Sequence, residues 1–144
     1  MRISAKGEYA IRAVLDLALH HGGGLMPIQE IAARQGIPQR YLEQVLLALK
    51  RAGLLVSKRG ASGGYHLTRP PEDVTVGDVL RAVEGASAPF EATRERGLRA
   101  ERDLVELWEE IAAAVAHVVD RLTFGELAAR VRERLSLERA MYHI

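Results

Sequence analysis

The chain has 144 residues, 48% of them hydrophobic and 27% charged, which suffices for one ordinary domain or for a small domain with an extension. Its formal net charge is only +1, but residues 1–84 hold eleven Lys and Arg against eight acids, whereas residues 85–144 hold nine against eleven. The absence of cysteine excludes disulfides, thiolate nucleophiles, and metal sites or iron–sulfur clusters ligated by this chain's own thiolates.

The first 36 residues predict two helices. Ser4 can cap the first one, and the three glycines at 22–24 must end it. Pro27 suits the first turn of the second helix, which Gly36 breaks. No apolar signal-peptide run precedes these helices, and the chain has no apolar stretch of about 18 residues. We therefore expect a cytoplasmic protein without a membrane span.

A third helix is predicted to begin at Pro38 and to end at Gly53. Its apolar residues recur at i, i+3, i+4 and i+7 and form one inward stripe: Leu42, Val45, Leu46 and Leu49. Two helices joined by a short turn at Gly36 are typical of a helix-turn-helix, whose second helix lies in the major groove of DNA. The faces outside the stripe carry side chains able to bond base edges or phosphates: Gln39, Arg40, Glu43, Gln44, Lys50 and Arg51.

Two short strands are predicted at residues 54–57 and 65–68, joined by a glycine-rich segment that permits a tight reversal. Lys58 and Arg59 lie at the shoulder of this hairpin, and an Arg there fits the narrow, electronegative minor groove. Residues 34–69 carry seven Lys or Arg and a single acid. A basic helix followed by a basic β-ribbon is typical of a winged helix-turn-helix on DNA.

The rest of the chain predicts an extension built of helices. Residues 75–78 resemble a capping box and open a short helix that stops near Gly85, and residues 86–97 show no apolar period and are expected to form a loop. A long helix then runs from about residue 98 to 122, with apolar residues spaced 4, 3, 4, 3, 4. These residues are Leu104, Trp108, Ile111, Val115, Val118 and Leu122. Such a heptad seam predicts a dimer helix that packs on its twin.

A capping-box pattern at residues 123–126 predicts one more helix, followed by a loose tail at 136–144. The expected fold is mostly α with a small β-hairpin wing. It comprises a winged helix-turn-helix DNA-binding domain at 1–85, a loop at 86–97, and a long dimerisation helix plus a C-terminal helix at 98–135. The basic front and the acidic back suggest that the first part meets a polyanion and the second part meets protein.

Several short motifs occur in order and with tight spacing. They are Lys6-Gly7-Glu8-Tyr9-Ala10, Tyr41-Leu42-Glu43-Gln44, Ala52-Gly53-Leu54-Leu55, Arg59-Gly60, Gly63-Gly64-Tyr65, Arg69-Pro70, Ala82-Val83-Glu84-Gly85 and Leu107-Trp108. Over about residues 1–130 this set is similar to that of the Rrf-two (Rrf2) family of bacterial winged-helix regulators. Many members place three cysteines before the long helix as ligands of an iron–sulfur cluster, but residues 88–97 hold no Cys or His. The chain resembles the cluster-free branch, and no cofactor is expected.

The resemblance implies a homodimer whose long helices cross antiparallel on a partly palindromic DNA operator, with repression as the expected outcome. It places the third helix in the major groove and the wing in the minor groove. The residues it points to are Arg40, Tyr41, Glu43, Gln44 and Arg59, with phosphate contacts from Ser4, Lys6 and Tyr9. By side-chain chemistry, the base readers are Arg40, Glu43 and Gln44. The side chains expected to hold phosphates are Lys6, Tyr41, Arg51 and Lys58.

Other interpretations stay open at the level of sequence. Basic side chains on a helix can be only a solvated face, and the winged domain could instead dock on a metabolic enzyme as a protein–protein adaptor with incidental DNA affinity. A regulator could respond to a small-molecule effector between the long helix and the DNA-binding domain, to a partner enzyme, or to no signal. The five histidines lack metal-ligand spacing and no Ser/His/Asp arrangement occurs, so we expect neither a metal site nor an enzyme.

Overall fold

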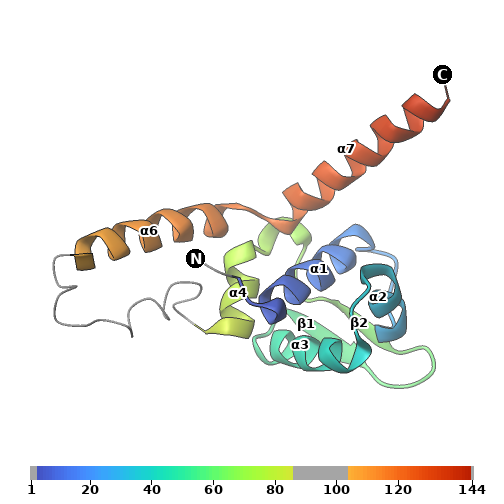
Figure 1. The fold of residues 1–144 in the computed structure, drawn as a ribbon. Coiled ribbons are helices and arrows are strands. Elements are labelled where there is room, and N and C mark those ends of the chain that lie inside the picture. The colour runs from blue at the N-terminus through green and yellow to red at the C-terminus, as the bar shows by residue number, and fades with distance from the viewer. Residues whose placement is uncertain (1–2, 86–103, 144) are drawn as a thin grey trace.

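The structure is a computed structural model that describes residues 3–85 and 104–143 (Figure 1). The predicted loop at 86–97 and the first part of the predicted long helix, 98–103, lie outside the described residues. The described elements are α1 (Ala5–Leu19), α2 (Ile28–Gln35), α3 (Gln39–Arg51), β1 (Leu55–Lys58), β2 (Gly64–Leu67), η1 (Pro71–Asp73), α4 (Val76–Glu84), α6 (Val105–Arg121) and α7 (Phe124–Tyr142).

Several helices of the N-terminal domain begin or end at the predicted signals, although α1 ends at Leu19, before the glycines at 22–24. Ser4 is the N-cap of α1, and its Oγ accepts a hydrogen bond from the backbone N–H of Gly7 at 3.0 Å. Gly36 ends α2 in the left-handed conformation with φ 62°, which residues bearing a Cβ rarely adopt. Thr75 and Asp78 form the predicted capping box of α4, each side chain accepting from the other's backbone N–H at 3.0 Å.

The wing is an antiparallel hairpin in which Leu55 pairs with Leu67 and Lys58 pairs with Gly64. Each strand is displaced by one residue toward the tip from its predicted position, because pairing continues as far as Lys58. A third short segment joins the sheet: Met26 and Tyr65 exchange two backbone hydrogen bonds of 2.9 Å. The connection between α1 and α2 is thereby fastened to the wing.

Helix α1 lies at the centre of the winged domain and packs against α3, α4 and the start of α7 (Figure 1). Among the described residues the buried core around it is aliphatic apart from Phe124, and its other most deeply buried large members include Val14, Ile31, Leu42, Leu46, Leu49, Leu55 and Leu80. The four apolar residues of the predicted α3 stripe are all at most 2% exposed. The period-3.6 pattern therefore identified the inner face of α3 correctly.

One charge lies inside this core. The carboxylate of Asp16 on α1 is 1% exposed and accepts two hydrogen bonds from the Arg34 guanidinium, each 2.9 Å, and one from Gln35 Nε2 at 3.1 Å. Hydrogen bonding to Asp16 raises the pKa of Arg34 above its usual value. The ion pair fixes α2, the first helix of the helix-turn-helix, against α1.

The C-terminal end of helix α6 lies next to α4, and its N-terminal end extends away from the winged domain (Figure 1). Its last turn is held to α4 by Arg81, whose two terminal nitrogens donate to the Asp120 carboxylate at 2.6 and 2.7 Å. The segment joining α6 to α7 is pinned by two backbone hydrogen bonds of 2.9 Å, from Val76 N–H to Leu122 O and from Phe124 N–H to Val74 O. The junction between the two C-terminal helices is therefore a fixed part of the fold.

Helix α7 begins at the predicted cap, where Thr123 Oγ1 accepts from the backbone N–H of Glu126 at 3.1 Å. Its first turns bury Phe124 and Ala128, but from Arg132 onward every described residue is exposed and the helix projects from the body (Figure 1). The expected loose tail from residue 136 is wrong, because α7 continues to Tyr142. Within residues 3–85 and 104–143, no helix combines the length and apolar character of a membrane span.

Candidate nucleic-acid interface

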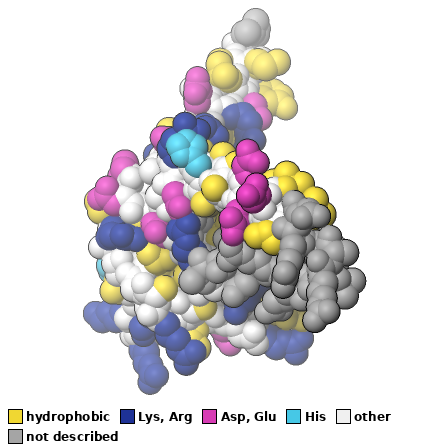
Figure 2. Space-filling view, turned by 90° about the vertical axis from the view of Figure 1, so that its left-hand side faces the viewer, with side chains coloured by type: hydrophobic (Ala, Val, Ile, Leu, Met, Phe, Trp, Pro, Cys, Tyr) yellow, Lys and Arg dark blue, Asp and Glu magenta, His cyan; other side chains and the backbone are white. Residues whose placement is uncertain are grey.

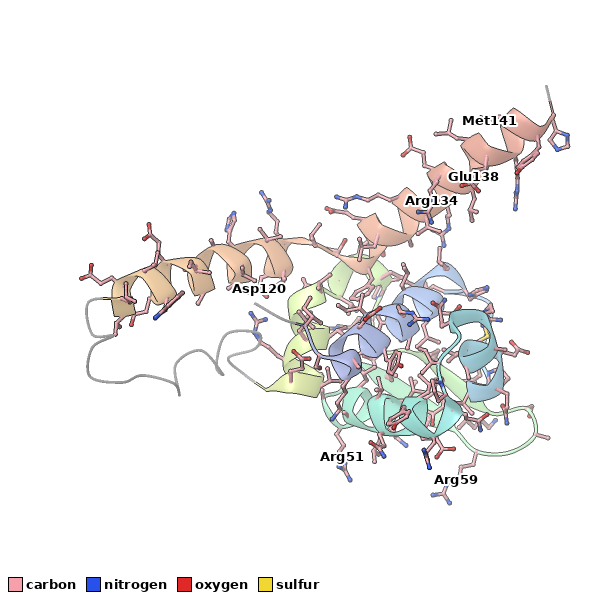
Figure 3. The ribbon with its side chains drawn as sticks, in the orientation of Figure 1. Arg51, Arg59, Asp120, Arg134, Glu138 and Met141 are labelled. Carbon is pink, nitrogen blue, oxygen red and sulfur yellow. The ribbon has the colours of Figure 1, made fainter. Side chains whose placement is uncertain are left out.

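The outer face of α3 carries the polar residues that the sequence assigned to DNA. The side chains of this group are all exposed: Gln39, Arg40, Tyr41, Glu43, Gln44, Lys50 and Arg51. The helix forms one edge of the molecule, and Lys and Arg side chains gather along that lower edge (Figure 2). Arg51 at the end of α3 and Arg59 in the wing both point away from the body on this side (Figure 3). The prediction that α3 and the wing share one basic surface therefore agrees with the arrangement in space.

A cleft of about 420 Å³ lies between α1 and α3. Its lining contains four residues that the sequence analysis selected, Lys6 and Tyr9 from α1 and Tyr41 and Gln44 from α3. The ammonium and the two phenols provide donors spaced along an apolar floor. Such a surface fits a sugar–phosphate backbone, which offers acceptor oxygens beside apolar sugar faces.

A second cleft of about 520 Å³ lies between α3 and the wing. Glu43 and Lys50 from α3 face Lys58 and Arg59 from the hairpin across it. The Nζ of Lys50 donates to Ser57 Oγ at 2.6 Å, which ties the last turn of α3 to β1. Helix α3 is consequently a ridge with a basic cleft on either side, a shape that can enter a groove while its flanks meet the two strands.

Glycine shapes the second cleft without supplying a contact of its own. A Cβ built on Gly64 would lie 2.5 Å from the backbone carbon and oxygen of Met26, so the close pairing of Met26 with β2 requires glycine there. The sequence analysis took the wing glycines as residues that shape the hairpin and let its backbone approach another surface closely. The structure adds a specific role for Gly64, namely access of the Met26 backbone to the sheet.

The geometry at Ser4 differs from a simple phosphate contact. The backbone N–H of Ser4 donates to Glu84 Oε1 at 3.1 Å, and its hydroxyl also donates to the same oxygen. Both donors are thus engaged by the carboxylate at the end of α4. A contact from Ser4 to DNA would have to replace Glu84, whereas Lys6 and Tyr9 meet no such competitor among the hydrogen bonds and ion pairs of the described residues.

Two residues on this face escaped the sequence analysis. The first is Arg12, whose guanidinium lies 5.6 Å from the centroid of the Tyr9 ring, a cation–π distance. The predicted site residue Arg40 is placed in the same way, 5.6 Å from the centroid of the Tyr41 ring. Leu47 is 46% exposed and lines the cleft between α3 and the wing. The helical period from Glu43 could have placed Leu47 on the outer face, but the sequence analysis left Leu47 unassigned.

The predicted dimer seam on α6 is only partly covered within one chain. Leu104 and Val118 are more than two-fifths exposed, Trp108, Ile111 and Val115 are partly buried, and Leu122 packs against the core of its own domain. None of the residues of α6 is fully buried within one chain. An apolar helix face of this kind is the surface that a twin helix would cover.

Comparisons with known proteins agree with this geometry. A family model described as "Rrf2: Iron-dependent Transcriptional regulator" matches residues 3–130. The HTH-type transcriptional regulator CymR of Bacillus subtilis (strain 168) is 39% identical over 129 residues, covering 90% of this chain and 91% of that protein. The solved structure of CymR, the global cysteine regulator of B. subtilis, matches with a TM-score of 0.76 over 90% of this chain and 98% of that one. T. potens IscR is 36% identical, with a TM-score of 0.75 over 93% and 90% of the two chains.

The description of the family includes iron, and the donor set of this chain can be tested against it. Iron–sulfur clusters are held by cysteine thiolates, and the sequence has no cysteine. In the part of the chain that the structure describes, no cluster of three or more His, Cys, Asp or Glu residues could hold a metal ion. The absence of cysteine and the described residues therefore do not fit an iron centre.

Proposed function

The chain belongs to the Rrf2 family and is a DNA-binding transcriptional regulator, and on this basis we propose that it acts in the cytoplasm as a homodimeric repressor on a partly palindromic operator. The observation that carries the proposal is the polar ridge of α3 between two clefts lined by Lys6, Lys58 and Arg59. A repressor of this kind acts by occupying the operator.

Residue roles follow from side-chain chemistry and position. Arg40, Glu43 and Gln44 project from the first half of α3, where a recognition helix meets base edges, and they suit guanine, cytosine and adenine respectively. Arg59 at the wing enters the minor groove. The phosphates are held by Lys6, Tyr9, Tyr41, Arg51 and Lys58, with Gln39 at the start of α3 beside them.

The dimer places two copies of α3 on one face of the duplex. We propose that the α6 seam pairs antiparallel with its twin, so that two half-sites lie about one helical turn, roughly 34 Å, apart. Because the dimer has two-fold symmetry, we expect the operator to contain an inverted repeat.

The test is a selection of genomic fragments by the purified protein, followed by a salt titration on the best fragment. Three basic phosphate contacts per protomer (Lys6, Arg51, Lys58) predict a slope of log K against log salt of about −5 for the dimer. Changing Lys58 to Ala should reduce that slope by about 2, and Arg59→Ala should weaken binding, whereas Arg134→Ala on the projecting end of α7 (Figure 3) should change neither. No enriched repeat, or a slope near zero, would contradict the proposal and favour an adaptor.

A further inference from the structure

Leu47 is an apolar side chain on the polar face of α3. It is 46% exposed, although the four residues of the inner stripe of the same helix are at most 2% exposed. Because Leu47 follows Glu43 by four positions and Gln44 by three, the three side chains lie on one face of the helix. The core therefore gains little from Leu47, and its exposed area faces the surface assigned to DNA.

The surroundings of Leu47 include several charged side chains. It lines the cleft between α3 and the wing together with Glu43, Lys50, Lys58 and Arg59. The bond from Lys50 to Ser57 holds the helix to β1 one turn beyond Leu47, so the position of this side chain relative to the wing is fixed. The exposed part of an isobutyl group gains free energy by contact with another apolar group, and the major groove offers one, the C5 methyl of thymine.

We propose that Leu47 contacts the C5 methyl group of a thymine in each half-site and thereby selects a T·A pair there. The inference rests on the proposed DNA-binding surface and adds a specificity-determining residue to it. The hydrogen-bonding side chains Arg40, Glu43 and Gln44 recognise donors and acceptors, which leaves the methyl group to an apolar side chain. Leu47 supplies that contact one turn further along the ridge.

Removing the methyl group from DNA tests the contact without altering the protein. Deoxyuridine differs from thymidine only by the missing methyl, so each thymine of the recovered operator is replaced by uracil, symmetrically in both half-sites. Wild-type protein should lose about fourfold in affinity per half-site at one such position, about fifteenfold for the dimer, and little at the others. The variant Leu47→Ala should bind thymine and uracil operators equally.

Two controls separate this contact from a general effect. Leu137→Ala removes an equally large side chain that is 62% exposed on α7, outside the proposed DNA-binding surface, and should retain the full preference for thymine. Leu47→Met keeps an apolar group of similar volume and should retain it as well. Circular dichroism melting checks that Leu47→Ala is folded, as expected for an exposed position.

The outcomes distinguish failure of the role proposed for Leu47 from failure of the proposed DNA-binding surface. Specific binding in which no uracil substitution matters, or in which Leu47→Ala keeps the wild-type preference, would refute the role of Leu47 and leave the regulator function standing. Absence of specific binding by wild-type protein would refute the proposed operator surface itself, and the inference with it.

Discussion

Replacing Arg34 by methionine removes one side of the ion pair that joins α1 to α2. In the structure the Asp16 carboxylate is 1% exposed and receives two of its three hydrogen bonds from Arg34. Methionine retains much of the aliphatic stem but no donor. The carboxylate is then left buried with Gln35 as its remaining hydrogen-bond partner among those the structure shows.

Breaking a buried pair from one side costs roughly 3–5 kcal/mol, because an uncompensated charge stays in the core. Here the Arg34 side chain is 35% exposed, so water reaches its end of the pair and can hydrate the carboxylate after the substitution. We therefore expect a loss of about 2–3 kcal/mol in the free energy of unfolding. For a chain of this length that corresponds to a fall in Tm of about 7–10 °C.

Thermal melting at equal protein concentration measures the loss, with Arg134→Met on the exposed end of α7 as the matched substitution. The double variant Asp16→Leu with Arg34→Met removes both charges and should recover most of the stability, since apolar replacements of a buried pair are often neutral. If Arg34→Met has the same melting temperature as Arg134→Met, the ion pair does not stabilise the contact between α1 and α2. The same conclusion follows if the double variant is as unstable as the sum of the two single losses.

Three further changes test other parts of the structure. Leu104→Glu places a charge in the α6 seam and should convert the dimer to a monomer in sedimentation equilibrium; an unchanged mass would remove Leu104 from the interface. Asp120→Asn should cost under about 1 kcal/mol at pH 7, because the pair with Arg81 is largely solvated. Hydrogen bonding to Arg81 lowers the pKa of Asp120 below 3.8, so this contribution is complete above pH 3.8 and disappears as the pH falls through the folded-state pKa; urea titrations from pH 7 to 2 should show wild type and variant converge. Gly64→Ala should displace Met26 from the wing and weaken operator binding in a fluorescence anisotropy titration, with the helical signal in circular dichroism retained.

Much of the winged domain could be predicted from the sequence because its signals are local and strong. The α3 stripe, the Ser4 cap, the Gly36 turn and the capping box at residues 75–78 each determine their structure within a few residues. The strands came out one residue off, since hairpin register depends on cross-strand pairing that a short apolar run does not specify.

The sequence predicted too early an end for the C-terminal helix, for a different physical reason. The apolar period fades after Leu135, so a rule based on amphipathic faces sees an end at Ser136. Residues 126–140 nevertheless consist almost entirely of Glu, Leu, Ala and Arg, which are strong helix formers, and the helix propagates on that propensity. Leu47 at the interface was missed because α3 contains several Leu residues. Which of them is exposed depends on small differences in helical phase.

The contact between Ser4 and Glu84 could not have been predicted, because it joins residues 80 positions apart and depends on how α4 packs beside α1. The family resemblance included Glu84 in a motif and Ser4 as a phosphate contact, without indicating that the two residues meet. The same holds for the bond between Arg81 and Asp120, whose partners belong to helices separated by residues 86–103.

The pairing of Met26 with Tyr65 determines whether the wing is already ordered before the protein binds DNA. A two-stranded hairpin alone is marginally stable in water, so an untethered wing would be ordered only on the DNA, at a cost to affinity. With the α1–α2 connection hydrogen-bonded along its outer edge, the wing loses its conformational freedom when the domain folds. Amide hydrogen exchange at Met26 and Tyr65 should then be as slow as in the core helices, and the association rate with DNA should not be limited by rearrangement of the wing.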